Sequence, residues 1–114
     1  MVRRHCLALD LKDNAELIQQ YEYYHSKEGI WPEVLNSLKA SGIESLEIYR
    51  TGNRLFMIME VGPDFSFQKK NQLDQDNPKI QEWEALMWTF QQALPWALEG
   101  EKWIVMNKIF DMKG

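Results

Sequence analysis

The chain has 114 residues, of which 45% are hydrophobic and 26% are charged, and its formal net charge at pH 7 is -4. This length predicts a single domain over residues 1–114, near the size at which a partner subunit adds useful buried surface. The negative charge argues against a nucleic-acid partner. The sequence shows no signal-peptide pattern and no run of about 20 apolar residues, so we expect a cytoplasmic protein without a membrane partner.

The first third of the chain predicts a strand followed by two helices. Residues 3–11 alternate leucines with other residue types, at the period of a half-buried strand. Asp13 begins a capping-box pattern, which predicts a helix through about His25. Pro32 suits the first position of a second helix, and Gly42 is the expected C-terminal cap of that helix.

Two alternating segments, residues 43–50 and 54–61, flank Thr51-Gly52-Asn53 and predict a β-hairpin. If Thr51 faces Arg54, the hairpin has one apolar face and one mixed face. The apolar face would hold Leu46, Ile48, Met57 and Met59, and the mixed face would hold Glu47, Tyr49, Phe56 and Glu60.

The second half of the chain predicts helices and one more strand. A helical region after residue 66 should break near Asp76-Asn77-Pro78, because proline disfavours helix at the residue before it. Apolar residues at three- and four-residue spacing then predict an amphipathic helix over residues 78–94. An irregular connection over 95–103 leads to a last strand of mixed character over 103–110.

The order strand, helix, two strands, helix, strand predicts an α+β fold of the ferredoxin-like, split βαβ type, with an antiparallel sheet and helices on one face. The other face would expose Phe56 and Ile58 beside Glu47 and Glu60. Large exposed apolar patches are rare in monomers, so this face should be covered by a second subunit or line a pocket. We expect a dimer.

Tyr21 and His25 lie four residues apart on the first predicted helix, so their side chains can converge on one small ligand. Histidine titrates close to neutral pH and can both donate and accept a proton within one catalytic cycle. The competing interpretation is structural, because a histidine at a helix C-terminus also complements the helix dipole.

Other kinds of catalytic site find little support in the sequence. The two histidines have no HxH, HxxxH or HExxH spacing, so we expect no metal. Cys6, the only cysteine, has no activating neighbour in sequence, and phosphate-binding glycine motifs are absent. We therefore expect no cofactor.

Five tryptophans and four tyrosines are many aromatic residues for this length. Aromatic residues at helical spacing, such as Trp83, most often build the core. Flat rings next to hydroxyl and carboxylate groups also suit a carbohydrate, whose ring presents apolar C–H faces edged by hydroxyls.

Five short motifs occur in order along the chain and together resemble the L-rhamnose mutarotase family. They are Tyr21-x-x-x-His25, Ile30-Trp31-Pro32-Glu33, Ile48-Tyr49, Leu55-Phe56-Met57 with Glu60, and Gln81-Glu82-Trp83. The stretches RTGNRLFMIMEV and QEWEALMWTFQQALPWALEGEKW are more similar to a branch of that family associated with L-fucose.

This resemblance implies a dimeric ferredoxin-like isomerase that interconverts the α and β anomers of a 6-deoxy-L-hexose, L-fucose or L-rhamnose, without cofactor or metal. It implies that His25 donates a proton to the ring oxygen, that Tyr21 contacts the sugar, and that Trp83 packs on the sugar face. The remaining expected substrate-binding residues are Trp31, Tyr49 and Glu84. The sequence departs from the family pattern in three places. Glu84 stands where the family has a second tryptophan, and Leu46 stands where it has a tyrosine. The spacing from His25 to Trp31 is about two residues longer than in the rhamnose enzymes.

The second proton-transfer group stays open at this point among Glu84, Glu33 and Tyr49. Two other functions also remain as alternatives. Small dimeric ferredoxin-like proteins include cofactor-free monooxygenases, because a fold does not fix a function. A non-catalytic sugar-binding module is the third possibility.

Overall fold

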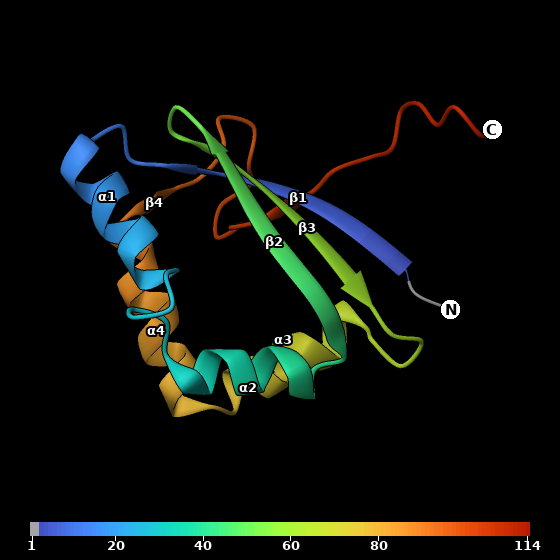
Figure 1. The fold of residues 1–114 in the computed structure, drawn as a ribbon, viewed down its shortest axis with the longest axis horizontal. Helices are drawn as coiled ribbons and strands as arrows, with labels where there is room; N and C mark the ends of the chain where they lie inside the picture. Colours follow the sequence, from blue (N-terminus) through green and yellow to red (C-terminus); the bar gives the residue numbers. More distant parts are fainter. Residues whose placement is uncertain (1–2) are drawn as a thin grey trace.

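The computed structural model describes residues 3–114 and has an antiparallel sheet with helices on one face (Figure 1). The strand order is β2-β3-β1-β4, and β5 also pairs with β1. This is the expected ferredoxin-like fold; residues 1 and 2 of the predicted domain lie outside the described residues. The elements are β1 (Arg3–Leu11), α1 (Ala15–Tyr24), α2 (Pro32–Ala40), β2 (Ile43–Thr51), β3 (Arg54–Val61), α3 (Phe67–Gln75), α4 (Pro78–Trp88), β4 (Gln91–Gln92) and β5 (Ile104–Val105).

The start of α1 differs by one residue from the prediction. Asn14, and not Asp13, is the N-cap: its backbone is extended and its Oδ1 accepts a hydrogen bond of 3.0 Å from the amide of Leu17. Both residue types cap helices well, so the sequence alone did not separate them. The helix ends at Tyr24, with His25 as its C-cap, which places the imidazole at the end of the helix.

The predicted hairpin is confirmed, including its register. Thr51 pairs with Arg54, and Gly52 takes a positive φ of 55° in the two-residue turn, a conformation that glycine adopts without strain. Ile48 lies opposite Met57, so the apolar side chains of β2 and β3 share one face as expected.

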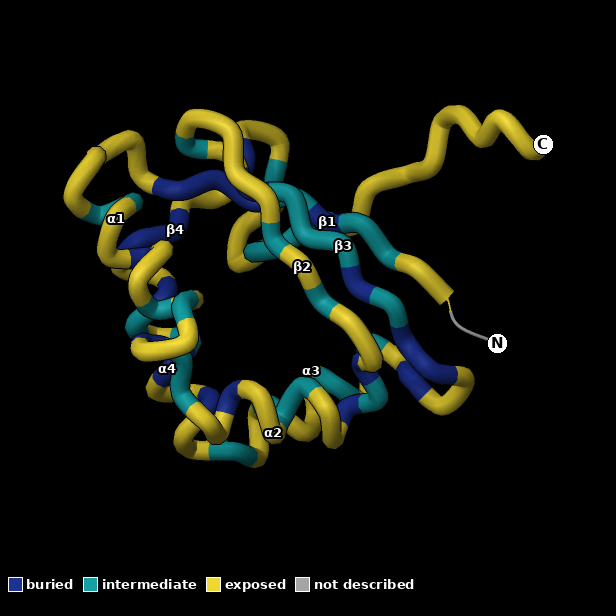
Figure 2. Tube along the Cα trace, viewed as in Figure 1, coloured by how far each residue is buried: buried dark blue, intermediate teal, exposed yellow. Residues whose placement is uncertain are grey.

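The core lies between this apolar face of the sheet and the helices, and buried residues concentrate there in Figure 2. One cluster joins α1, α2 and α4 to the sheet, and a second lies at the other end of the sheet. The first contains Leu11, Tyr21, Val34, Leu55, Ile80, Trp83, Met87 and Phe90. The second contains Leu7, Ile43, Met59, Val61 and Phe65. We call the helix-covered side of the sheet the inner face and the opposite side the outer face.

The helix predicted over residues 78–94 ends early, at Trp88. The hydroxyl of Thr89 donates to the carbonyl of Leu86 at 2.6 Å and closes the last turn. The chain then joins the sheet: the carbonyl of Phe90 accepts from the amide of Lys12 at 2.8 Å, and β4 pairs with the end of β1. Pairing with the free edge of β1 therefore replaces the last turns of the predicted helix.

The strand predicted over residues 103–110 is also much shorter. Only Ile104–Val105 form a strand, and the amide of Met106 adds one hydrogen bond to Cys6. The following residues, 107–110, run polar, polar, apolar, apolar, and so lack the alternation that would bury one side of a strand. Figure 1 shows the chain leaving the body of the protein beyond this point.

Candidate active site

The ring of His25 is held by a hydrogen bond to the backbone of its own helix. Its Nδ1 lies 2.8 Å from the carbonyl oxygen of Tyr21. A carbonyl oxygen can only accept, so Nδ1 donates and carries the hydrogen. In the neutral ring Nε2 therefore keeps its lone pair and is the nitrogen available for proton transfer.

The surroundings of His25 favour its neutral form. The side chain is exposed enough to meet a solute, yet the rings of Tyr21 and Trp83 lie 4.3 and 5.6 Å away between centroids. Desolvation by the surrounding protein lowers the pKa of His25, and the hydrogen bond to the Tyr21 carbonyl opposes this only in part. At pH 7 the ring is neutral and Nε2 is a proton acceptor.

Three segments bring aromatic rings together next to His25. Trp83 comes from α4 and is buried. The ring of Trp31, just before α2, lies 5.2 Å from that of Trp83 at 66°, and the ring of Tyr24 on α1 lies 6.2 Å from it at 86°. Such edge-to-face contacts are favourable for aromatic pairs. We call His25, Tyr21, Tyr24, Trp31 and Trp83 the aromatic cluster.

Tyr21 is buried at the inner side of this cluster, with 3% of its surface exposed. Its hydroxyl accepts a hydrogen bond of 3.4 Å from the side-chain nitrogen of Gln91. Burial raises the pKa of Tyr21 to about 12, against a smaller opposing effect of the Gln91 bond. The phenol is therefore protonated at neutral pH and is a hydrogen-bond donor, not a base.

Gln91 is a polar residue of the site that the sequence did not indicate. It is 4% exposed, and within residues 3–114 its Oε1 has no hydrogen-bond partner. Most buried side-chain oxygens are paired. A glutamine in a predicted helix carries no distinguishing sequence signal, and only its position in β4 brings it to Tyr21.

Glu84 lies beside the aromatic cluster and pairs with a lysine from the connection after β4. The ammonium of Lys102 makes a close ion pair with Oε2 of Glu84 and lies 4.8 Å above the ring of Trp88. The charge of Glu84 adds to the desolvation that raises the pKa of Tyr21.

Tyr49 is placed differently from the other expected site residues. It pairs with Phe56 on the outer face of the sheet, where 55% of its surface is exposed. Its neighbour Ile48 points to the inner face and packs on the core. The structure thus brings together Tyr21, His25, Trp31 and Trp83, with Glu84 nearby, but does not bring Tyr49 to them.

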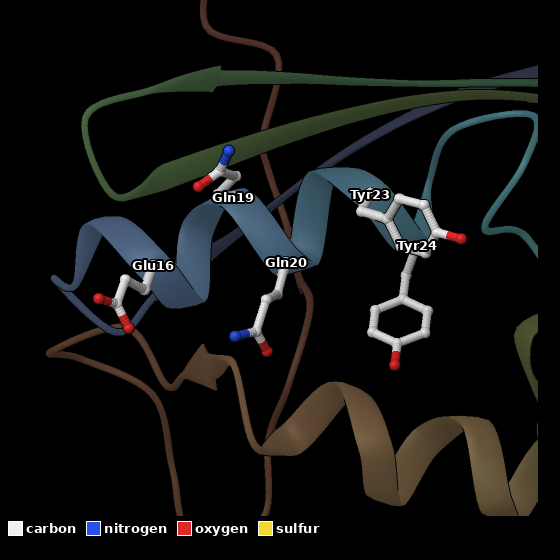
Figure 3. A pocket seen from close by; sticks show the side chains of 5 residues that line it. All are labelled: Glu16, Gln19, Gln20, Tyr23 and Tyr24. Carbon is white, nitrogen blue, oxygen red and sulfur yellow. The ribbon is translucent and has the colours of Figure 1, made fainter.

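An open depression of about 580 Å³ lies along the exposed side of α1 (Figure 3). It is lined by Glu16, Gln19, Gln20, Tyr23 and Tyr24. In Figure 3 the side chain of Tyr24 points toward α4, and that of Gln19 points toward the hairpin of β2 and β3. Its lining contains no histidine, so we place the candidate active site at His25.

Two kinds of feature are absent from residues 3–114. No group of three or more His, Cys, Asp or Glu side chains is close enough together to hold a metal ion. No helix is long and apolar enough to cross a membrane.

Comparison with known proteins gives consistent results. A family model described as L-rhamnose mutarotase matches residues 4–112. The chain is 50% identical over 109 residues to an L-fucose mutarotase of Xanthomonas campestris pv. campestris, covering 96% of this chain and 87% of that protein. It is 38% identical over 112 residues to a UPF0734 protein of Dictyostelium discoideum, covering 92% and 86%.

Two solved structures resemble the fold. An L-rhamnose mutarotase from Formosa agariphila superposes with a TM-score of 0.69 at 22% identity, covering 96% of this chain and 98% of that one. A dimeric ferredoxin-like protein from an uncultured marine organism gives a TM-score of 0.51 at 15% identity, covering 95% and 90%. At these identities the likeness supports the fold.

Proposed function

Because this chain belongs to the L-rhamnose mutarotase family, we propose that it is a carbohydrate isomerase that interconverts the α and β anomers of a 6-deoxy-L-hexose, L-fucose or L-rhamnose. The family match over residues 4–112 and the 50% identical L-fucose mutarotase support this assignment. The structural observation that carries it is the position of His25, a neutral, solvent-accessible imidazole against the aromatic rings of Tyr21 and Trp83.

Exchange of anomers moves one proton within the sugar. The anomeric hydroxyl loses a proton, the ring oxygen gains one, and the bond between the anomeric carbon and the ring oxygen breaks to give an open aldehyde. Rotation about the adjacent carbon–carbon bond and the reverse steps close the ring as the other anomer. The reaction needs no electrons and no net proton, so acid–base groups and a binding surface suffice.

We assign to His25 the protonation of the ring oxygen. Since the ring is neutral at pH 7, it must first take up the proton that it delivers. The anomeric hydroxyl is the source that the reaction provides, and its oxygen is bonded to the same carbon as the ring oxygen. One Nε2 therefore serves both oxygens in turn, as acceptor and then as donor.

The neighbours of His25 suit binding and orientation. We assign packing on the C–H face of the sugar to Trp31, which is only partly buried, and to the small exposed part of Trp83. We assign to the Tyr21 hydroxyl, which is protonated and buried beside Gln91, a hydrogen bond that orients the sugar. We assign to Glu84, which follows Trp83 in the chain, a contact with a sugar hydroxyl, from which its carboxylate can accept a hydrogen bond. Glu33, two residues after Trp31, is exposed, and Tyr49 is on the outer face.

The activity should be tested by saturation-transfer NMR of anomer exchange with L-fucose, L-rhamnose, D-galactose and D-glucose and one protein preparation. We expect exchange well above the buffer rate for a 6-deoxy-L-hexose and weaker exchange for D-glucose. Equal inactivity on all four sugars would contradict the proposal. Binding of a sugar without faster exchange would instead indicate a non-catalytic sugar-binding module, and oxygen uptake with aromatic substrates would indicate a monooxygenase.

The catalysed rate should fall on the acidic side of neutrality. A protonated His25 cannot accept the anomeric proton, and desolvation lowers its pKa below the usual value of about 6.5. We expect a nearly constant rate from pH 7 upward to pH 9 and, below the pKa of His25, about a tenfold loss for each pH unit. The same NMR assay, corrected for exchange in buffer, measures this profile. A catalysed rate that rises as the pH falls below 6 would contradict it.

The proposal includes a homodimer built from one domain over residues 1–114 and located in the cytoplasm. The outer face of the sheet supports the dimer, because Tyr49 is 55% exposed there and Phe56 and Ile58 are only half-buried. One solved protein with this fold is described as dimeric. A second copy would cover these side chains.

A further inference from the structure

The last nine residues, 106–114, contain no helix or strand and end in a turn closed by the amide of Gly114 on the carbonyl of Asp111; we call them the C-terminal arm. In Figure 1 this arm leaves the body of the protein after β5. Three of its four large apolar side chains are almost entirely exposed: Ile109 is 96%, Met112 85% and Phe110 78% exposed, whereas Met106 is 44% exposed. Within residues 3–114 these three have the largest exposed fractions among the large apolar side chains. Several exposed apolar side chains in one short segment are typical of a surface that contacts another molecule.

The outer face of the sheet provides a complementary surface. Cys6 and Ala8 on β1 alternate with the buried Leu7 and therefore point outward, and Phe56 and Ile58 on β3 lie opposite them. These side chains are neither fully buried nor fully exposed. Because all helices of the described chain pack on the inner face, the outer face is left without a covering layer (Figure 1).

The length and charge of the arm fit this face. The six residues before the turn, 106–111, reach at most about 20 Å when extended, about two thirds of the length of the nine-residue strand β2. The arm carries Lys108 and Lys113, and the outer face carries Glu47 and Glu60. Lys108 contacts Asp111 within the arm, and Glu60 lies 3.5 Å from Arg4, but these pairs are exposed and exchange partners at little cost.

We propose that the C-terminal arm of each protomer packs on the outer face of the partner in a symmetric homodimer. The arm does not cover its own outer face, since its apolar side chains stay exposed in the single chain. A two-fold axis lets each arm reach the other copy, so the contact forms twice. This inference rests on the proposed homodimer and specifies the segment that stabilises it.

The first test removes the apolar contacts of the arm without shortening it. In sedimentation velocity, the Ile109→Ser/Phe110→Ser protein should dissociate with a Kd at least about 100-fold higher than the unaltered chain, since two large side chains are lost from each of two contacts. Leu98→Ser is the matched control, because Leu98 is 73% exposed but belongs to the connection before β5. It should leave the Kd unchanged.

The second test uses Cys6, the only cysteine, as a reporter on the outer face. A Phe110→Cys protein should form a disulfide-linked dimer under mild oxidation, and peptide mapping should find Cys6 of one chain joined to the cysteine introduced at position 110 of the other. An oxidised species of monomer mass would show that the arm folds onto its own chain and would overturn the proposal.

The possible outcomes separate this inference from the proposed function. A monomeric unaltered chain would refute both the homodimer and the arm contact. A dimer whose Kd is unaffected by the arm substitutions would refute the arm contact alone. Anomer exchange, measured in parallel on the unaltered chain, tests the activity independently of both results.

Discussion

Replacing His25 by alanine should reduce the catalysed rate of anomer exchange by about 10²- to 10⁴-fold, the range that general acid–base catalysis supplies. The loss should appear in kcat, because the imidazole carries the proton and contributes little apolar contact to binding. The side chain is exposed and caps the end of α1, so the fold should survive, as circular dichroism and thermal unfolding would verify. Saturation-transfer NMR with L-fucose gives the rate.

His5 provides the matched control for this experiment. It is the only other histidine and lies on β1, where its ring is 5.0 Å from that of Phe67 and so at the other end of the sheet. His5→Ala should keep the exchange rate within about twofold. A folded His25→Ala protein with the rate of the unaltered chain would remove the proposed role of His25.

Replacing Trp83 by alanine should cause the largest loss of stability of any change in the aromatic cluster. Trp83 is 6% exposed and packs against the rings of Trp31, Tyr24 and His25. Loss of a buried tryptophan costs about 3–5 kcal/mol of the free energy of unfolding. Urea unfolding would measure this loss. Trp88→Ala, on the same helix but 38% exposed, should cost about 1 kcal/mol or less.

The contribution of Trp83 to binding needs a milder change. Trp83→Phe keeps an aromatic ring in the core but presents less surface to a sugar. We expect about a tenfold increase in KM, equivalent to about 1.4 kcal/mol of lost packing, with kcat changed much less. Steady exchange rates at increasing L-fucose concentration separate the two constants. An unchanged KM would place the sugar away from Trp83.

Much of the fold could be predicted because strong periodicity and unambiguous turn residues coincide. The hairpin register followed from Gly52-Asn53, and the helix break followed from Pro78. The predictions that were wrong concern segments whose secondary structure depends on tertiary contacts. Residues 90–92 carry a helical pattern, yet backbone pairing with the edge of β1 is available to them and ends the helix at Trp88.

The candidate site was predictable in part. The spacing of Tyr21 and His25 fixed their proximity within one helix, but the approach of Trp31 to Trp83 depends on how α2 and α4 pack. The position of Tyr49 could have been anticipated, because the predicted register already placed it on the face opposite Leu46 and Ile48. Gln91 could not, since its partner Tyr21 lies 70 residues away.

The acceptor that orients His25 belongs to the main chain, and any amino acid at position 21 would supply it. The tautomer of the imidazole is therefore independent of the side chains that we propose to contact the sugar. We expect substitutions at those side chains to change sugar preference while leaving the tautomer of His25 unchanged. Related proteins that act on different sugars would then share the same acid–base histidine and differ in the side chains that line the sugar site.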